Sequence, residues 1–159
     1  KFDINMIILL WILVFLATFS FMEFMAWFSH KYIMHGFGWF LHKDHHLKDH
    51  KSWWERNDFF FVFYAVISML FFMNGNLFGI AIGAGITAYG AAYFFVHDIF
   101  IHQRFKIFRN ANNWYARGIR RAHKMHHKHI GKEDGDCFGM LLPPLKYFKK
   151  ELNNAKRKA

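Results

Sequence analysis

Residues 22–46 read MEFMAWFSHKYIMHGFGWFLHKDHH, and within them an apolar segment passes directly into a run of histidines. The same change recurs once, where the apolar residues 77–96 lead into HDIFIHQR at residues 97–104. Long apolar runs joined to clustered polar groups predict helices in lipid with a polar cap at one end. This junction is the main clue to the architecture of the whole chain.

The composition favours a membrane protein. The chain has 159 residues, which predicts a single domain over residues 1–159, with 54% hydrophobic residues and a net charge of +10. Apolar and basic character together indicate segregation, with apolar runs in lipid and charge outside it. Because the apolar runs account for the composition, no nucleic-acid partner is expected. The single cysteine, Cys137, excludes an intramolecular disulfide.

Three apolar runs predict an all-α integral membrane protein with about three transmembrane helices. The spans are expected at about residues 4–28, 59–73 and 77–96. A bilayer core of about 30 Å needs about 20 helical residues, so the first and third runs are long enough and the second is short. Asn74-Gly75-Asn76 is a strong turn signal, so the second and third runs are expected to form a helical hairpin.

Aromatic and small residues have expected roles in this hairpin. Trp53 and Trp54 precede the short run and are expected to lie at the membrane interface and lengthen it. Gly79, Gly83 and Gly90 would let a neighbouring helix approach closely. The alternative is that these glycines only make the helix flexible.

Basic residues set the predicted orientation. All but one of the 21 Lys and Arg residues lie on one side of the three-span arrangement. The positive-inside rule makes that side cytoplasmic, so the N-terminus lies outside and the C-terminus inside. The basic tail at residues 145–159 alternates lysines with apolar residues, which favours an interfacial helix on anionic lipid.

All twelve histidines fall on the predicted cytoplasmic side, where they form a histidine-rich helical cap. Ten of them make four clusters of two kinds, HxxxxH and HxxHH. The clusters are His30 and His35; His42, His45 and His46; His97 and His102; and His123, His126 and His127. His50 and His129 are left over.

The two spacings make different demands on a helix. Positions i, i+3 and i+4 share one face, so each HxxHH can direct at least two imidazoles to one point. Positions i and i+5 lie about 140° apart, so an HxxxxH pair cannot hold one ion from an ideal helix. Either the helix is distorted there, or the two imidazole rings point in different ligation directions. Gly36 and Gly38 would ease a distortion at the first pair, and no glycine follows the second.

The order of the clusters predicts two half-sites of five histidines, one from residues 30–46 and one from residues 97–127. Two metals are favoured because one ion cannot take ten ligands. Imidazole suits iron, zinc, copper or nickel, so the ligand type does not fix the metal. A pH-sensitive or headgroup-binding histidine surface is the alternative reading of the same clusters.

Carboxylates near the clusters are candidates to accept the second N–H of a ligating imidazole. Those beside the clusters are Asp44, Glu55, Asp58 and Asp98, and for each the alternative is a solvated surface group. Glu23 differs because it lies inside the first apolar run, where an ionisable group is costly and usually functional. We expect it to have a polar partner within the membrane.

Four stretches together resemble the fatty acid hydroxylase superfamily and, more closely, its bacterial β-carotene 3-hydroxylases. They are residues 22–46, WWERND at 53–58, HDIFIHQR at 97–104, and RAHKMHHKHIGKEDGDCFGMLLPP at 121–144. The resemblance implies two iron ions, dioxygen as co-substrate, and all ten cluster histidines as ligands. His50 is not part of the motif, and His129 is either near the metals or a solvated loop residue.

The same resemblance implies hydroxylation at C3 of the β-ionone rings of β-carotene, giving β-cryptoxanthin and zeaxanthin. Electrons would come from NAD(P)H through a ferredoxin and its reductase, and the site would lie in the bacterial cytoplasmic (inner) membrane. Arg117, Arg120 and Arg121, close to His123, are the expected docking surface for that acidic partner. Zinc could replace iron in a purified sample.

Two other functions remain open from the sequence. One is a hydroxylase or desaturase of fatty acyl or sterol lipids from the same superfamily. The other is a membrane protein that binds metal or heme without catalysis. The substrate in every enzymatic case would be a long apolar molecule taken from the bilayer.

Overall fold

The computed structural model describes residues 3–47, 52–108, 110–133 and 135–157, which form helices and connecting loops. His50 lies outside the described residues. The elements are α1 (Ile4–Phe28), the π-helical η1 (Ser29–Phe37), α2 (Trp39–Leu47), α3 (Asp58–Met73), α4 (Leu77–Phe94), the π-helical η2 (Phe95–Ile101), α5 (Trp114–Lys128) and α6 (Leu145–Lys156).

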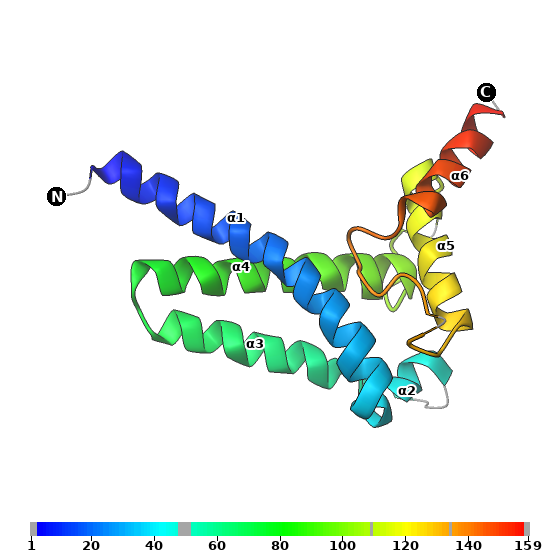
Figure 1. Cartoon of the computed structure of the whole chain (residues 1–159), viewed down its shortest axis with the longest axis horizontal. Helices are drawn as coiled ribbons and strands as arrows, with labels where there is room; N and C mark the ends of the chain where they lie inside the picture. Colours follow the sequence, from blue (N-terminus) through cyan, green and yellow to red (C-terminus); the bar gives the residue numbers. More distant parts are fainter. Residues whose placement is uncertain (1–2, 48–51, 109, 134, 158–159) are drawn as a thin grey trace.

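Three apolar helices form the body of the molecule. α3 and α4 run antiparallel as a hairpin, and α1 crosses α4 obliquely (Figure 1). The predicted turn is confirmed at Asn76, whose side chain accepts the Gly79 N–H at 2.7 Å and caps α4. α1 and α3 both pack along α4.

Close approach to α4 depends on three glycines. A Cβ at Gly85 would lie 2.8 Å from Cβ of Thr18 in α1, and one at Gly83 would lie 3.0 Å from the Ser68 carbonyl oxygen in α3. One at Gly79 would likewise lie 3.0 Å from the Phe71 carbonyl oxygen in α3. A side chain at any of the three positions would force the helices apart. The prediction is therefore confirmed at Gly79 and Gly83. It is wrong at Gly90, where a Cβ would meet only the Phe61 ring at an ordinary 3.6 Å.

The structure fits an all-α membrane protein. Two helical segments, Ile4–Phe37 and Leu77–Ile101, are long and apolar enough to cross a bilayer. The helix Asp58–Met73 is apolar but shorter, and Trp53 and Trp54 lie in the turn before it rather than extending it. Large apolar side chains stand out from these helices, and Leu9 and Leu70 are 56% and 58% exposed. Exposed surface of this kind suits contact with lipid tails.

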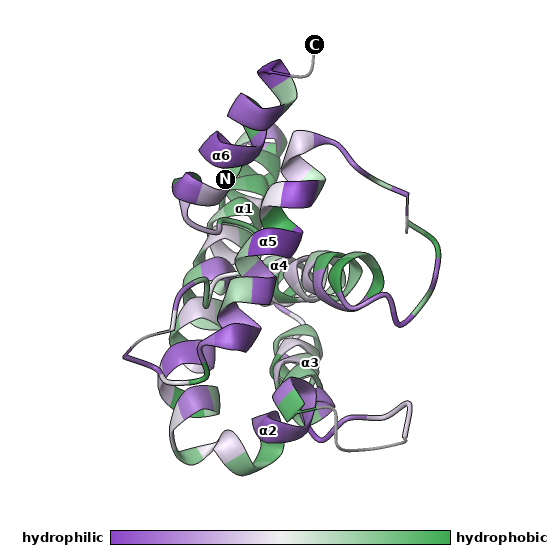
Figure 2. Ribbon diagram, turned by 90° about the vertical axis from the view of Figure 1, so that its right-hand side faces the viewer, coloured by the Kyte–Doolittle hydropathy of each residue, from purple (hydrophilic) through white to green (hydrophobic). Residues whose placement is uncertain are grey.

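The polar elements gather at one end of the apolar helices (Figure 1), and hydrophilic residues concentrate in α2, α5 and α6 (Figure 2). α6 packs on α5, with the Phe148 ring stacked on Tyr115 at 5.3 Å. Tyr147 is buried, while Leu145 and Leu152 are exposed. Part of the apolar face predicted to meet lipid is therefore used inside the cap.

Candidate metal centre

Both HxxxxH clusters lie in π-helical turns. A π-helix closes its hydrogen bonds from residue i to i+5, as the His102 N–H does to the His97 carbonyl at 2.9 Å. Residues five apart then share a face, and the ring centroids of His30 and His35 lie 5.2 Å apart while those of His97 and His102 lie 4.6 Å apart. Of the two alternatives for this spacing, the structure shows the distorted helix.

The two turns reach this geometry differently. η1 contains Gly36, whose φ of −112° and ψ of −128° interrupt the helix, and Gly38, where a Cβ would lie 2.8 Å from the Ile33 carbonyl oxygen. η2 has no glycine and keeps its π turn among larger residues. Glycine therefore helps the first turn but is not required for the second.

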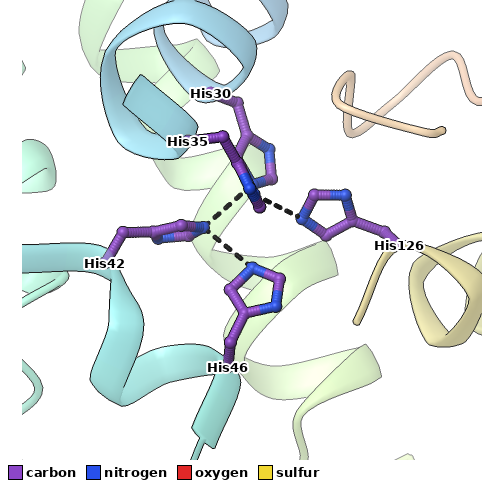
Figure 3. A group of neighbouring side chains, drawn as sticks. All are labelled: His30, His35, His42, His46 and His126. Carbon is purple, nitrogen blue, oxygen red and sulfur yellow. Dashed lines mark hydrogen bonds between the residues drawn. The ribbon is translucent and has the colours of Figure 1, made fainter. Parts of the chain in front are cut away.

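Nine histidines converge in two groups. In each group the nearest nitrogen atoms lie within 4.8 Å of one another. The five-histidine group is His30, His35, His42, His46 and His126 (Figure 3). The four-histidine group is His45, His102, His123 and His127. Segments from the two halves of the chain contribute to each group.

The structure divides the histidines differently from the predicted half-sites. In each HxxHH cluster the outer pair, i and i+4, joins one group, and the middle residue, i+3, points to the other. His45 thus leaves the early half-site and His126 leaves the late one. On an α-helix, position i+4 lies about 40° from position i, while position i+3 lies about 60° from i in the opposite direction. Each helix therefore directs two rings to one group and one ring to the other.

The other candidate histidines lie outside both groups. The His97 ring is adjacent to the four-histidine group, 4.7 Å from the His45 ring and 4.6 Å from the His102 ring. His129 is the residue that ends α5.

Four rings of the five-histidine group donate Nδ1–H to a neutral oxygen. The pairs are His30 with the Phe138 carbonyl at 3.0 Å, His35 with the Ile130 carbonyl at 2.7 Å, His126 with the Asp136 carbonyl at 3.2 Å, and His42 with the Asn57 side-chain oxygen at 2.6 Å. A carbonyl oxygen only accepts, so the hydrogen is on Nδ1 and a neutral ring presents a bare lone pair at Nε2.

Those lone pairs face one another. Nε2 of His30 lies 3.1 Å from Nε2 of His42, and Nε2 of His35 lies 3.2 Å from Nε2 of His126 (Figure 3). Burial lowers the pKa of His42 to about 3, which keeps that ring neutral. Two nitrogens bound at right angles to one ion at about 2.1 Å are about 3 Å apart, so the set fits a cation held between them.

The four-histidine group also fits a cation. Nε2 of His123 lies 2.7 Å from Nε2 of His102 and 2.8 Å from Nε2 of His127. Nε2 of His45 is buried and has no hydrogen-bond partner among the described residues. Burial holds the pKa of His45 and that of His123 well below the ordinary value, so both rings are neutral.

Carboxylates support the four-histidine group. His45 donates Nδ1–H to Glu55 at 2.7 Å, and His97 donates to Asp98 at 3.1 Å. Arg104 pairs with Glu55 at 3.3 Å, with Asp98 at 3.2 Å and with Asp58 at 3.0 Å. One guanidinium, on a side chain only 11% exposed, therefore compensates three acidic groups beside this site.

Among the residues that the structure describes, two of the proposed nearby carboxylates, Glu55 and Asp98, contact a histidine. Asp58 acts through Arg104 and accepts the Glu55 backbone N–H at 3.0 Å, and Asp44 accepts the Arg56 backbone N–H at 2.8 Å. Glu23 binds backbone N–H groups of the loop after α5.

The profile described as "Fatty acid hydroxylase" matches residues 15–148. The chain belongs to the fatty acid hydroxylase family. It is 41% identical over 143 residues to the β-carotene hydroxylase of Pantoea ananas, covering 86% of this chain and 81% of that relative. It is 36% identical to the β-carotene hydroxylase of a Paracoccus strain, covering 88% and 89% of the two chains. No solved structure gives a significant match.

A plant relative also matches this member of the fatty acid hydroxylase family. The chloroplastic β-carotene hydroxylase 2 of Capsicum annuum is 38% identical over 151 residues, which cover 86% of this chain and 48% of the plant protein. The family resemblance inferred from the histidine motifs is confirmed by these matches.

An apolar cavity of about 540 Å³ adjoins the site in this fatty acid hydroxylase family member. It lies among α1, α3 and α4 and reaches His97 and Asp98 at the cap end. Its far end reaches Phe72 in α3, fourteen residues beyond Asp58 in the same helix, or about 21 Å at 1.5 Å per residue. A cavity of this size and lining suits part of a long apolar ligand.

The three arginines predicted to dock a partner are used within the chain. Arg117 and Arg121 pair with Glu151 of α6 at 2.9 Å and 3.1 Å. Arg120 donates to the Ala111 and Phe108 carbonyls at 2.8 Å and 2.9 Å. These contacts give the arginines a structural task and weaken their case as a docking surface.

Sequence reasoning missed the neutral supports of the five-histidine group. Asn57 lies in the WWERND segment, between the two flagged acidic residues, and an amide beside a histidine cluster was the available signal. The Phe138, Ile130 and Asp136 carbonyls belong to the backbone, and no residue type announces them.

Proposed function

We propose that this chain is a non-heme di-iron hydroxylase, a single membrane domain that hydroxylates C3 of the β-ionone rings of β-carotene to give β-cryptoxanthin and zeaxanthin. The opposed Nε2 lone pairs of the five-histidine group carry the metal part of this proposal. The relatives named β-carotene hydroxylase, at 41% and 36% identity over most of the chain, support the substrate.

All ten cluster histidines are the proposed iron ligands. Four histidines with Nδ1 fixed on a neutral oxygen, and His45 with Nδ1 fixed on Glu55, have their Nε2 oriented before any ion binds. Iron held there supplies the redox chemistry that oxidises an unactivated C–H bond with dioxygen. Zinc fits the same nitrogens, so a purified sample can carry the wrong metal.

The apolar cavity is the proposed binding site for one end of the carotenoid. Its walls carry aromatic side chains such as Phe60, Tyr64 and Tyr93, and its cap end lies against His97. The helices would hold the ring beside the metals and exclude water from it. The rest of the molecule would remain in the bilayer, from which it enters.

The proposed orientation places the cap and the C-terminus in the cytoplasm, with three passes through a bacterial inner membrane. The concentration of basic residues in the cap segments supports it. Two electrons per turnover would come from an acidic ferredoxin, supplied by its reductase, and membrane lipids would contact the basic tail.

Carotenoid analysis in a β-carotene-producing host tests the function. Expression of the chain should yield β-cryptoxanthin and zeaxanthin, and the His42→Ala variant should yield neither. Unchanged β-carotene together with hydroxylated or desaturated fatty acids or sterols would favour the lipid enzyme suggested by the family description.

Metal analysis of the same purified protein separates the remaining possibilities. We expect about two iron ions per chain. A Soret band would show bound heme, and metal uptake without any product in the host would indicate a binding protein that is not an enzyme. One ion per chain at full activity would contradict the di-iron proposal.

A further inference from the structure

Glu23 is an acidic residue of the apolar helix α1, five residues before its last residue Phe28, and among the described residues its carboxylate is hydrogen-bonded to no histidine. Both of its oxygens act as acceptors. Oε1 accepts the backbone N–H groups of Met140, Leu141 and Leu142, each at 3.0 Å, and Oε2 accepts the Tyr89 hydroxyl at 2.6 Å. Such a set repays the high cost of placing a charge in this position.

The loop held by Glu23 is the one that supports two rings of the five-histidine group. The Phe138 carbonyl accepts from Nδ1 of His30, and the Asp136 carbonyl accepts from Nδ1 of His126. The first of the three anchored N–H groups is only two residues beyond Phe138. Fixing those N–H groups therefore restricts the direction of both carbonyls.

The fit between this loop and the carboxylate is tight. A Cβ at Gly139 would lie 2.9 Å from Glu23 Oε1, so glycine is the residue that allows the contact. The Phe138 ring is buried and packs edge-on against the His30 ring at 5.6 Å and the His126 ring at 5.2 Å. Movement of the loop would displace both rings.

We propose that Glu23 is a positioning residue for the five-histidine group, acting through the backbone of residues 136–142. This rests on the proposed function only in taking the group to be a metal site. The four-histidine group does not depend on this loop in the same way, because its member His45 is held by Glu55 and the adjacent His97 by Asp98. Loss of Glu23 should therefore weaken one metal site and spare the other.

Two substitutions of Glu23 should loosen the loop to different degrees. Glu23→Ala leaves the three converging N–H groups without their acceptor, so the loop loses its anchor. Glu23→Gln keeps one carbonyl oxygen for those N–H groups and turns the other position into a donor, which the Tyr89 hydroxyl can accept. Gln should therefore rescue most of what Ala loses.

The rate of iron loss to a chelator, measured by elemental analysis on purified full-length protein, tests the proposal. In Glu23→Ala one of the two ions should leave at least about tenfold faster, the scale typical of lost outer contacts, while the other leaves at the wild-type rate. Glu23→Gln should lie close to wild type. Ser20→Ala is the control, because the Ser20 hydroxyl on the same helix donates to the Leu16 carbonyl at 2.9 Å, within α1 itself. Equal acceleration of both ions, or of neither, overturns the proposal.

Combination with ligand variants identifies the site affected. His126→Ala already damages the five-histidine group, so adding Glu23→Ala should cause little further loss of iron. Added to His127→Ala, the same change should weaken the remaining site and remove both ions. The reverse pattern would place the effect at the four-histidine group and overturn the proposal.

Hydrogen exchange gives a readout that needs no metal. The amides of Met140, Leu141 and Leu142 should exchange faster in Glu23→Ala than in wild type, and Glu23→Gln should restore protection. Unchanged exchange overturns the anchor even if iron is lost. Wild-type protein that takes up fewer than two ions while Glu23 still protects these amides contradicts the di-iron function and leaves the anchoring of the loop supported.

Discussion

In the five-histidine group four Nδ1–H groups donate to neutral oxygens, whereas at and beside the four-histidine group those of His45 and His97 donate to the carboxylates of Glu55 and Asp98. A carboxylate makes the imidazole that donates to it a more basic metal ligand. Its negative charge also offsets the charge of a bound ion, whereas a neutral carbonyl has no charge to do so. The two groups share their histidine motifs but differ in the residues that hold the rings. We infer that backbone geometry mainly positions the ligands of the five-histidine group, and that carboxylate charge mainly stabilises the ion at the four-histidine group.

Loss of a ligand should have the largest effect. His42→Ala and His126→Ala come from different motifs but share the five-histidine group, so both should abolish hydroxylation and release the same ion. Carotenoid products and iron per chain measure this. His50→Ala, outside the motif, is the control and should keep most activity; equal loss in all three would show that ligands and other histidines were sorted wrongly.

Removal of Arg104 should destabilise the fold beside the four-histidine group. Its side chain is 11% exposed and pairs with three carboxylates, so Arg104→Gln leaves them uncompensated and should cost about 3 kcal/mol or more of unfolding free energy. Thermal unfolding in detergent measures it. Arg56→Gln is the matched control, because Arg56 is 53% exposed and its pair with Asp44 should contribute about 1 kcal/mol at most.

Neutralising Glu55 tests whether charge dominates at the four-histidine group. Glu55→Gln keeps an oxygen near His45 but removes the charge, and the affinity for one ion should fall about 10–100-fold. Chelator competition measures the change. Asp44→Asn removes a carboxylate that binds Arg56 rather than a histidine, so a similar fall there would argue against a specific role for Glu55.

Reversing the charge on the exposed face of α5 should change the activity least. Lys124 and Lys128 are exposed and follow His123 and His127, so their replacement by Glu should slow ferredoxin-driven turnover a few-fold at low salt. High salt should shrink the difference because screening already weakens the attraction. Lys149→Glu with Lys150→Glu on α6 is the control, and an equal effect there would indicate general attraction rather than docking near the four-histidine group.

Much of the fold and the identity of the histidines could be predicted from periodicity and spacing. Apolar runs set the helices, and the Asn-rich turn set the hairpin, because both signals are local. The exchange of His45 and His126 could not be predicted, since it depends on how α2 and α5 face each other. The carbonyls that hold His30, His35 and His126 were also invisible, because every residue has one.

The π-helical turns bear on how this chain tolerates insertion and deletion. Each turn spaces its two histidines one residue further apart than the i and i+4 pair that an α-helix would place on one face. Deleting one residue between His97 and His102 would let an α-helix form there, but everything after it would rotate by about 100°. A single lost codon in either turn would therefore put α2 or α5 out of register with its partners. Such a deletion would abolish the metal centre although every histidine codon remained in the gene.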